Sequence, residues 1–278
     1  MSIAGRPRLQ RLRQLPLIAL APNILTLLAL CAGLTAVRFA LAERWELAVV
    51  SIFVAGIFDG LDGRVARLLQ TSSKFGAELD SLADFVSFGV APGLVLYLWS
   101  LHAGGGLGWV VALVYIICVG LRLARFNTAL EDPAKAVIAS HFFTGVPSPP
   151  GGGLVLLPLI LHFQFGWGGF RAPFLVGLWA LIVGALMISA LPTYAFKKIR
   201  VPREFVLPTL LIIGLFAASI ATMPWATLAT LGVAYVATFP FAYRAHQRMT
   251  RAPAFVPPEV LPPEPQGVAN APDFDKTR

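Results

Sequence analysis

Four aspartates stand close together in a part of the chain that is otherwise apolar. Asp59 and Asp62 are three residues apart, and Asp80 and Asp84 are four residues apart. Each spacing places both members of the pair on one face of a helix. Because charged side chains at membrane depth are costly, carboxylates in such a position indicate a functional site. We therefore expect the two pairs to converge.

Carboxylates that converge repel one another strongly unless a cation lies between them. Oxygen ligands of this kind bind hard divalent ions, and Mg²⁺ and Mn²⁺ both accept them. A two-metal site is suited to displacement at phosphorus, because it stabilises both the entering and the leaving oxygen. We expect two divalent ions, Mg or Mn, to bind here. Their ligands would be Asp59, Asp62, Asp80 and Asp84.

Small residues accompany the aspartates at fixed positions. Gly63 and Ala66 share a helix face with the first pair, and Gly76 lies just before the second pair. Their lack of bulk would let a nucleotide or a pyrophosphate approach the backbone. Small residues also allow close packing of membrane helices, which is an alternative explanation for each of them singly. As a set in register with the aspartates, they favour a binding site.

The rest of the chain must place these residues inside a membrane. Hydrophobic residues make up 57% of the chain and charged residues 13%, and the mean hydropathy is +0.74. These values predict an all-α, polytopic bundle of about eight transmembrane helices, with six as the lower bound. The expected segments are approximately Pro22–Leu41, Leu47–Leu69, Leu79–Leu101, Leu107–Arg125, Gly152–Phe165, Pro173–Leu191, Phe205–Ala221 and Trp225–Tyr243.

Basic residues alternate between the loops, which predicts the orientation of the bundle. One set of loops is rich in Lys and Arg, whereas the opposite loops carry only Arg44 and Arg171. By the positive-inside rule both termini lie in the cytoplasm, as does the hairpin around Thr71–Phe75. The net charge of +8 is thus a signal of topology, and no nucleic-acid partner is expected. We divide the chain into a basic segment (1–21), a transmembrane domain (22–250) and a disordered Pro-rich tail (251–278).

The residues from Asp59 to Asp84 match the pattern D-x2-D-G-x2-A-R-x8-G-x3-D-x3-D at every defined position. This pattern resembles the signature of the CDP-alcohol phosphatidyltransferase family. The resemblance implies a metal-dependent site that is open to the cytoplasmic leaflet and releases CMP. It also implies that Asp84 is the catalytic base as well as a metal ligand. Gly63, Ala66 and Arg67 would border the CDP group.

Longer stretches resemble the phosphatidylserine synthase branch of that family. They are Pro22–Thr26, Ser73–Pro92, Arg122–Asn127 and Phe143–Pro149, so the likeness covers about residues 16 to 150. The branch implies CDP-diacylglycerol as donor and L-serine as acceptor, in a bacterial inner (cytoplasmic) membrane. Small alanines often follow the last stretch in the family, whereas Pro150 and three glycines follow it here. This departure leaves the start of the fifth helix open.

Side chains outside the aspartate motif are candidates for substrate contacts. Asn23 and Thr26 would bind the cytosine or ribose, or would cap the first helix. A guanidinium binds a carboxylate in bidentate fashion, so Arg122 and Arg125 are candidates for the serine carboxylate, with Asn127 beside them. Topological anchoring is the alternative for both arginines, and Arg125 is the stronger candidate of the two.

Two rival functions remain at this point. The same chemistry with another acceptor, such as glycerol 3-phosphate or inositol phosphate, is compatible with the motif. A cation transporter would also explain intramembrane carboxylates, but it gives no reason for the Gly-Ala-Arg spacing. The family likeness makes a homodimer the expected assembly.

Overall fold

The computed structural model describes residues 20–71, 73–130, 142–189, 192–194 and 205–251, with side chains described except at 129–130, 142–144, 192–194 and 239–251. The basic segment and the Pro-rich tail lie outside these ranges. The elements are α1 (Ala21–Leu41), α2 (Trp45–Leu69), α3 (Lys74–Asp84), η2 (Phe85–Val90), α4 (Ala91–Trp99), η3 (Leu101–Gly104), α5 (Gly105–Leu130), β1 (Phe142–Thr144), α7 (Ser148–Val155), α8 (Leu157–Phe165), η4 (Gly168–Arg171), α9 (Pro173–Ile188), β2 (Pro192–Tyr194), α10 (Val206–Thr222) and α11 (Pro224–Arg251).

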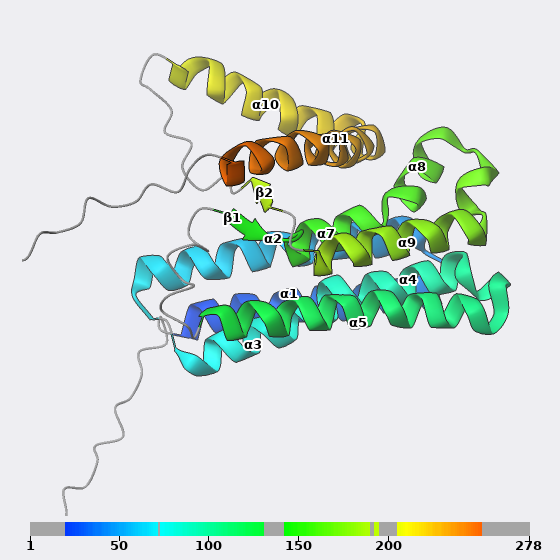
Figure 1. Ribbon diagram of the computed structural model, residues 1–278, viewed down its shortest axis with the longest axis horizontal. Coiled ribbons are helices and arrows are strands. Elements are labelled where there is room, and N and C mark those ends of the chain that lie inside the picture. The colour runs from blue at the N-terminus through cyan, green and yellow to red at the C-terminus, as the bar shows by residue number, and fades with distance from the viewer. Residues whose placement is uncertain (1–19, 72, 131–141, 190–191, 195–204, 252–278) are drawn as a thin grey trace, which may run out of the picture.

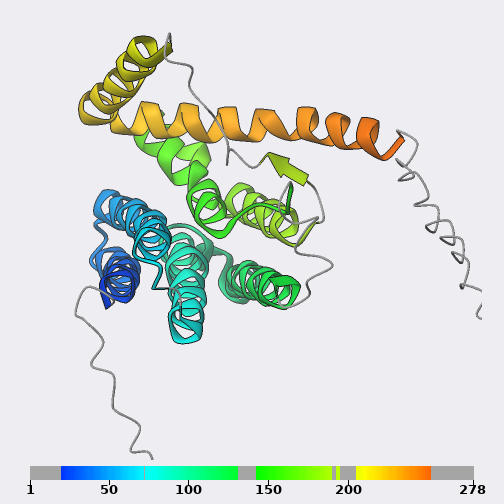
Figure 2. The ribbon, with the colours of Figure 1, turned by 90° about the vertical axis from the view of Figure 1, so that its left-hand side faces the viewer.

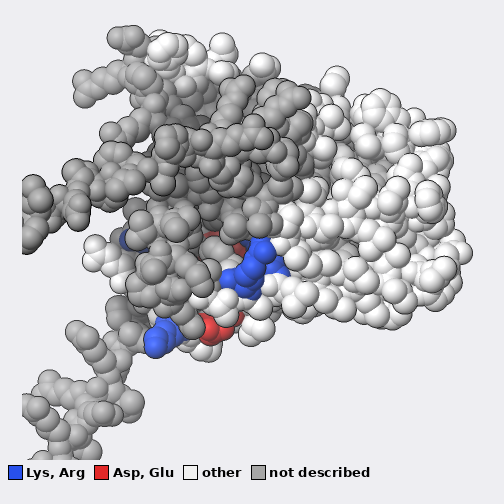
Figure 3. Space-filling view, viewed as in Figure 1, with Lys and Arg blue, Asp and Glu red and all other residues white. Residues whose placement is uncertain are grey.

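The chain is an integral membrane protein with an all-α bundle. Three described helical segments are long and apolar enough to cross a bilayer, namely Ala21–Leu41, Lys74–Trp99 and Leu101–Thr128. Two shorter apolar helices, Pro173–Ile188 and Val206–Thr222, accompany them. On the face drawn in Figure 3, the described Lys, Arg, Asp and Glu residues gather toward one end, and the rest of the described surface carries none. The expected fold class is confirmed, and each of the expected segments corresponds to one helix or to two or three consecutive helical elements.

Helices α1 and α2 form a closely packed hairpin (Figure 1). Both helices bury small residues, such as Ala36 and Ala40 on α1 and Ala48 and Ala55 on α2. Small side chains let membrane helices approach closely, and the close contact is stabilised by dispersion forces. The hairpin therefore gives Asp59 and Asp62, near the end of α2, a rigid support.

A π-helical turn, Phe85–Val90, begins immediately after Asp84 and is held from several sides. The Ser87 hydroxyl donates to the Ala29 carbonyl of α1 at 3.2 Å. The Tyr115 hydroxyl donates to the Phe88 carbonyl at 2.8 Å, so it satisfies a carbonyl within the wide turn. A Cβ at Gly152 would lie 3.0 Å from the Phe88 Cα, so α7 presses against the turn through glycine. Such turns often mark functional sites, and this one fixes the end of α3.

The fifth expected segment consists of two short helices, and it begins earlier than predicted. Helix α7 starts at Ser148 rather than near Gly152, because Pro149 and Pro150 suit the first turn of a helix. The glycines that follow are packing positions. At Gly151, for example, an added Cβ would lie 2.7 Å from the Met187 side chain of α9. The unusual Pro-Gly-Gly-Gly run thus lets α7 enter the bundle.

Two features of the fold have no counterpart in the sequence prediction. Strands β1 and β2 pair antiparallel, with Phe142 opposite Tyr194 and Thr144 opposite Pro192. Helix α10 has no buried residue and contacts α11. Figure 2 shows α11 lying obliquely across the side of the bundle rather than parallel to it.

The start of α1 and the end of α11 lie at the same end of the molecule (Figure 1). The side of the membrane that this end faces stays a prediction.

Candidate functional site

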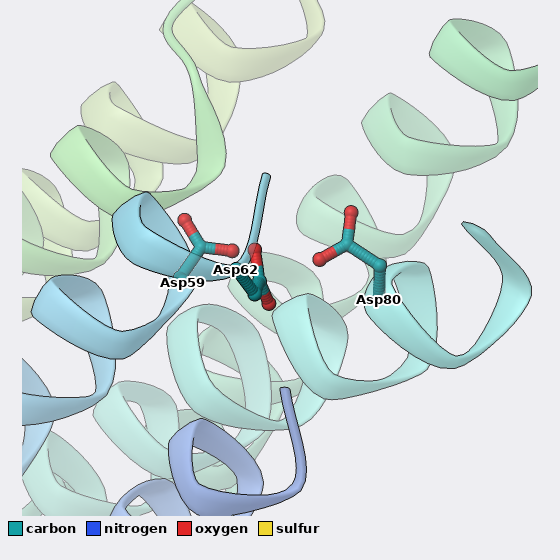
Figure 4. A group of neighbouring side chains, drawn as sticks. All are labelled: Asp59, Asp62 and Asp80. Carbon is teal, nitrogen blue, oxygen red and sulfur yellow. The ribbon is translucent and has the colours of Figure 1, made fainter. Parts of the chain in front are cut away.

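Two helices bring three of the predicted carboxylates together. Asp59 and Asp62 extend from α2, and Asp80 extends from α3 toward them (Figure 4). One carboxylate oxygen from each of the three lies within 4.8 Å of the others. Asp62 is only 5% exposed. The convergence that was predicted from the helical spacing is therefore present, and it joins the ends of α2 and α3.

Asp84 completes the group from the next turn of α3. Its carboxyl group is within hydrogen-bonding contact of Asp59 and interacts electrostatically with Asp80. Within the described part of the chain, no ion pair joins any of the four aspartates to a lysine or arginine. Unscreened carboxylates at these separations repel one another strongly, so the cluster requires a positive charge or protons.

Thr26 of α1 orients one of the carboxylates. Its hydroxyl lies 2.7 Å from Asp62 Oδ2 and 3.1 Å from the Pro22 carbonyl oxygen. The shorter contact indicates that the proton is donated to Asp62. Hydrogen bonds of this kind fix the direction of a carboxylate that binds a metal. Thr26 therefore acts on the aspartate group as well as on the cavity beside it.

A cavity of about 150 Å³ adjoins the aspartates between α1, α2 and α3. Five of the six residues predicted to bind the CDP-lipid line it, together with Asp62 and Asp80; they are Asn23, Thr26, Gly63, Ala66 and Gly76. The sixth, Arg67, is exposed one turn beyond Gly63 and does not line the cavity. The cavity is thus bordered by the small residues on one side and by carboxylates on the other.

The start of α3 forms one wall of this cavity. Ser73 caps the helix, because its hydroxyl accepts a hydrogen bond from the Gly76 amide at 3.0 Å. A Cβ at Gly76 would lie 2.9 Å from Asn23 Oδ1, which is closer than real Cβ atoms come. Gly76 therefore permits the close approach of α1 and α3, and its packing role and its place in the cavity coincide.

Arg122 of α5 lies beside Asp84. It is 7% exposed, and its guanidinium donates from Nη1 to the Ser148 hydroxyl of α7. It also interacts electrostatically with Asp84 and with Tyr235 of α11. A buried arginine beside the carboxylates provides a positive charge next to Asp84. Arg122 is therefore buried within the bundle, unlike an arginine in a loop whose charge serves only to orient the protein in the membrane.

Arg125 and Asn127 have structural partners instead. The Arg125 guanidinium donates to the carbonyls of Ile188, at 2.6 Å, and Ser189, at 3.2 Å, so it binds the C-terminal end of α9. The Asn127 amide donates to the Ser81 hydroxyl at 2.9 Å and so joins α5 to α3 beside Asp80. Of the two arginines, Arg122 is the one that interacts electrostatically with Asp84. A substrate contact by Arg125 or Asn127 stays a prediction.

Two buried polar atoms lack a hydrogen-bond partner within the described residues, and both adjoin the aspartate group. They are Thr71 Oγ1, in the cavity beside α3, and Arg122 Nε. Buried polar groups are normally satisfied, so an orphaned atom needs an explanation such as a ligand. The Thr71 hydroxyl, near Asn23, can donate or accept a hydrogen bond. The Arg122 Nε, near Asp84, is a cationic donor. They mark two polar positions beside the carboxylates, one in the cavity and one next to Asp84.

The donor set fits a divalent cation. All the clustered ligand atoms are carboxylate oxygens, which hard divalent ions prefer. A bound cation would also remove the repulsion among the aspartates. The structure therefore supports a divalent-cation site at Asp59, Asp62 and Asp80.

Sequence reasoning missed Thr71 and Ser148 as members of the site. Ser148 was part of a matched stretch, but a serine before two prolines carries no signal of its own. Thr71 stands in the connection between α2 and α3, where a threonine carries no signal of its own. Only the burial of their neighbours and the orphaned atoms identify them.

A membrane-embedded helical bundle with a cluster of carboxylates that could hold a metal ion defines the class of this protein as an integral membrane protein with an acidic site. The family model described as CDP-alcohol phosphatidyltransferase matches residues 19–195, and a second, CDP-alcohol phosphatidyltransferase 2, matches residues 204–240. The chain belongs to the CDP-alcohol phosphatidyltransferase family, and its aspartate cluster is the part of the fold that carries the family signature.

Several curated relatives bear the name CDP-diacylglycerol–serine O-phosphatidyltransferase. The protein from Mycobacterium tuberculosis (strain ATCC 25618 / H37Rv) is 38% identical over 249 residues, which cover 90% of this chain and 86% of the relative. The protein from Helicobacter pylori (strain ATCC 700392 / 26695) is 37% identical over 65% of this chain and 74% of its own length. The Bacillus subtilis (strain 168) protein is 34% identical, over 64% of this chain and 91% of its own length.

Proposed function

We propose that this chain transfers the phosphatidyl group of CDP-diacylglycerol to L-serine and releases CMP. The observation that carries the proposal is the position of Asp84 between the three-aspartate group and the buried guanidinium of Arg122. The printed names of the relatives support serine as the acceptor. The transporter alternative loses its support, because the chain belongs to a family of transferases.

The CDP part of the donor occupies the cavity between α1, α2 and α3. There the side chains of Asn23 and Thr71 can form hydrogen bonds with the ribose or the cytosine. Such a bond would give the Thr71 hydroxyl the partner that it lacks among the described residues. Gly63, Ala66 and Gly76 leave room for the pyrophosphate next to the carboxylates. Arg67, exposed at the end of α2, is placed to meet the nucleotide from the aqueous side. The donor phosphorus then lies at the aspartate group.

Asp59, Asp62, Asp80 and Asp84 would hold the divalent ions. When bound, two Mg or Mn ions would supply charge neutralisation for the phosphate oxygens and for the departing CMP. Thr26 keeps Asp62 in the orientation that this binding needs. The π-helical turn after Asp84 keeps that carboxylate from moving away from the others.

Asp84 acts as the general base. The serine hydroxyl gives its proton to the Asp84 carboxylate as its oxygen forms a bond to the phosphorus of the phosphatidyl group. The bond between that phosphorus and the bridging oxygen of CMP breaks, and CMP leaves with the electron pair. The products are phosphatidylserine and CMP. Asp84 is suited to this task because it adjoins both the carboxylate group and Arg122.

Arg122 binds the carboxylate of serine and thereby places the hydroxyl against Asp84. Its guanidinium is fixed by Ser148, while its Nε has no partner among the described residues. A charge-assisted hydrogen bond from that side would hold one substrate oxygen. Asn127, near the same end of α5, completes the proposed acceptor side.

Arg122→Gln tests the acceptor assignment. We expect the KM for serine to rise by about tenfold or more, because a hydrogen bond to a charged group contributes roughly 1.5–3 kcal/mol. The KM for CDP-diacylglycerol should change much less. Steady-state CMP release in detergent, with each substrate varied in turn, measures both values.

The matched control is Arg125→Gln, which removes a guanidinium three residues away that binds α9. It should lower the thermal stability more than it alters the KM for serine. An equal rise in both KM values for Arg122→Gln would contradict a role in acceptor recognition. A thermal melt of each variant separates loss of fold from loss of binding.

The proposed location is the bacterial inner membrane, with the site open to the cytoplasm. The excess of Lys and Arg in the loops at the aspartate end of the bundle supports this orientation. A homodimer is proposed as the assembly, and the uncovered surface of α10 is compatible with it.

A further inference from the structure

A second cavity, of about 480 Å³, lies between α2, α7, α8 and α11. It is distinct from the cavity between α1, α2 and α3, and Phe53 is its only lining residue from α2 among those described. Its walls are almost entirely hydrocarbon, from residues such as Pro150, Leu157, Ile160 and Leu231. The two hydroxyl groups in its lining are those of Tyr235 and Thr238, and the latter donates to the backbone of its own helix. A polar ligand would find few partners here, whereas an alkyl chain would be well matched.

This cavity reaches the proposed catalytic site at three points. Tyr235 lines it and interacts with Arg122. Pro149 lines it and directly follows Ser148, which holds the Arg122 guanidinium. Phe53 precedes Asp59 by six residues on α2, or about 9 Å along the helix axis. Helices α2, α7 and α11, which carry these three residues, therefore form part of the apolar walls of this cavity.

We infer that this cavity holds one acyl chain of the diacylglycerol donor, with the glycerol end at Tyr235 and Pro149 and the chain running toward Leu228 and Ile160. The inference rests on the proposed function, since it assigns the lipid part of the same substrate. The nucleotide and the acyl chain then lie in different cavities, and α2 with its aspartates lies between them. The phosphorus is thereby held from both ends.

The benefit of such a cavity is positional. Bilayer hydrocarbon is as apolar as leucine, so a chain gains little hydrophobic energy on leaving the bilayer for the cavity. A chain that is held in one direction fixes the glycerol and hence the phosphate, which reduces the orientational freedom that the reaction must overcome. An ordinary bilayer lipid would have the same chain but no nucleotide to hold it at the site.

Photolabelling tests this assignment directly. CDP-diacylglycerol with a diazirine near the end of one acyl chain is added to the full-length protein in phosphatidylcholine vesicles, irradiated, and the labelled peptides are mapped. We expect label on the lining positions of α8 and α11, including Ile160 and Leu231. Unlabelled CDP-diacylglycerol should compete with it, and additional phosphatidylcholine should not.

A matched pair of variants sharpens the test. Leu231 and Val233 are both 52% exposed, but Val233 lies about 200° around α11 from Leu231 and does not line the cavity. Leu231→Trp should reduce the labelling of Ile160 that unlabelled CDP-diacylglycerol competes away by about tenfold, because the indole fills part of the cavity. Val233→Trp should leave it unchanged.

CMP release with serine, measured in the same samples, separates this inference from the proposed function. Competable label confined to other helix faces, or label that phosphatidylcholine displaces equally well, overturns the assignment even when CMP is released. Competable label in the cavity without CMP release supports the acyl-chain site and counts against the proposed reaction. Because the wild-type pattern decides the assignment, it does not depend on the folding of Leu231→Trp.

Discussion

Replacing Asp84 with asparagine is expected to reduce turnover by about a thousandfold or more, within the range for losing a positioned general base. The amide has nearly the shape of the carboxylate but cannot accept the proton of the acceptor hydroxyl. Three carboxylates of the cluster remain, so CDP-diacylglycerol binding that depends on a divalent ion should be partly retained. CMP release and equilibrium binding of the donor measure the two effects separately.

The control is Glu78→Gln, which makes the same chemical change on the same helix at an exposed position. It should leave turnover close to that of the wild type. A wild-type rate for Asp84→Asn would remove Asp84 as the base. A complete loss of donor binding would show instead that Asp84 acts chiefly as a ligand within the cluster.

Removing divalent ions is the second change with a large expected effect. Treatment with EDTA should abolish CMP release, and Mg²⁺ or Mn²⁺ should restore it. The physical reason is that three carboxylates with oxygens within 4.8 Å of one another repel when they have no cation among them. The anionic donor would add to that repulsion. Activity as a function of free metal concentration gives the measurement.

Asp80→Asn provides a matched test of where the ions bind. Loss of one charged ligand should raise the half-saturating metal concentration by about tenfold or more, as perturbing even an outer hydrogen bond costs a factor of 10–100 in metal affinity. The exposed Glu78→Gln variant again serves as the reference. A rate that is indifferent to chelation would contradict the metal-assisted account.

The aspartate cluster was predictable because its information is local. Helical spacing places Asp59 with Asp62 and Asp80 with Asp84, and one short hairpin brings the two helices together. The membrane helices were predictable for a similar reason, since length and hydropathy suffice to define them. Gly63 and Ala66 follow from their register with the first aspartate pair, whereas Asn23 and Thr26 were assigned from the family resemblance.

Other parts of the site depend on contacts between distant segments, which no local pattern reports. The Arg122–Ser148 pair joins α5 to α7, and the Arg125 contact joins α5 to the end of α9. The sequence gives both arginines the same positive-inside signal, so only their burial and partners distinguish them. The π-helical turn after Asp84 also depends on tertiary partners, because Tyr115 satisfies one of its carbonyls from another helix.

The measurement that tests the central claim most directly is an acceptor screen. Purified protein in detergent receives CDP-diacylglycerol, Mg²⁺ or Mn²⁺ and, in separate reactions, L-serine, glycerol 3-phosphate, inositol or inositol phosphate, while CMP release is followed. Release of CMP with serine alone, accompanied by phosphatidylserine, is the predicted result. Release with another acceptor but not with serine would contradict serine as the substrate, and no release with any acceptor from folded protein would contradict the proposed reaction itself.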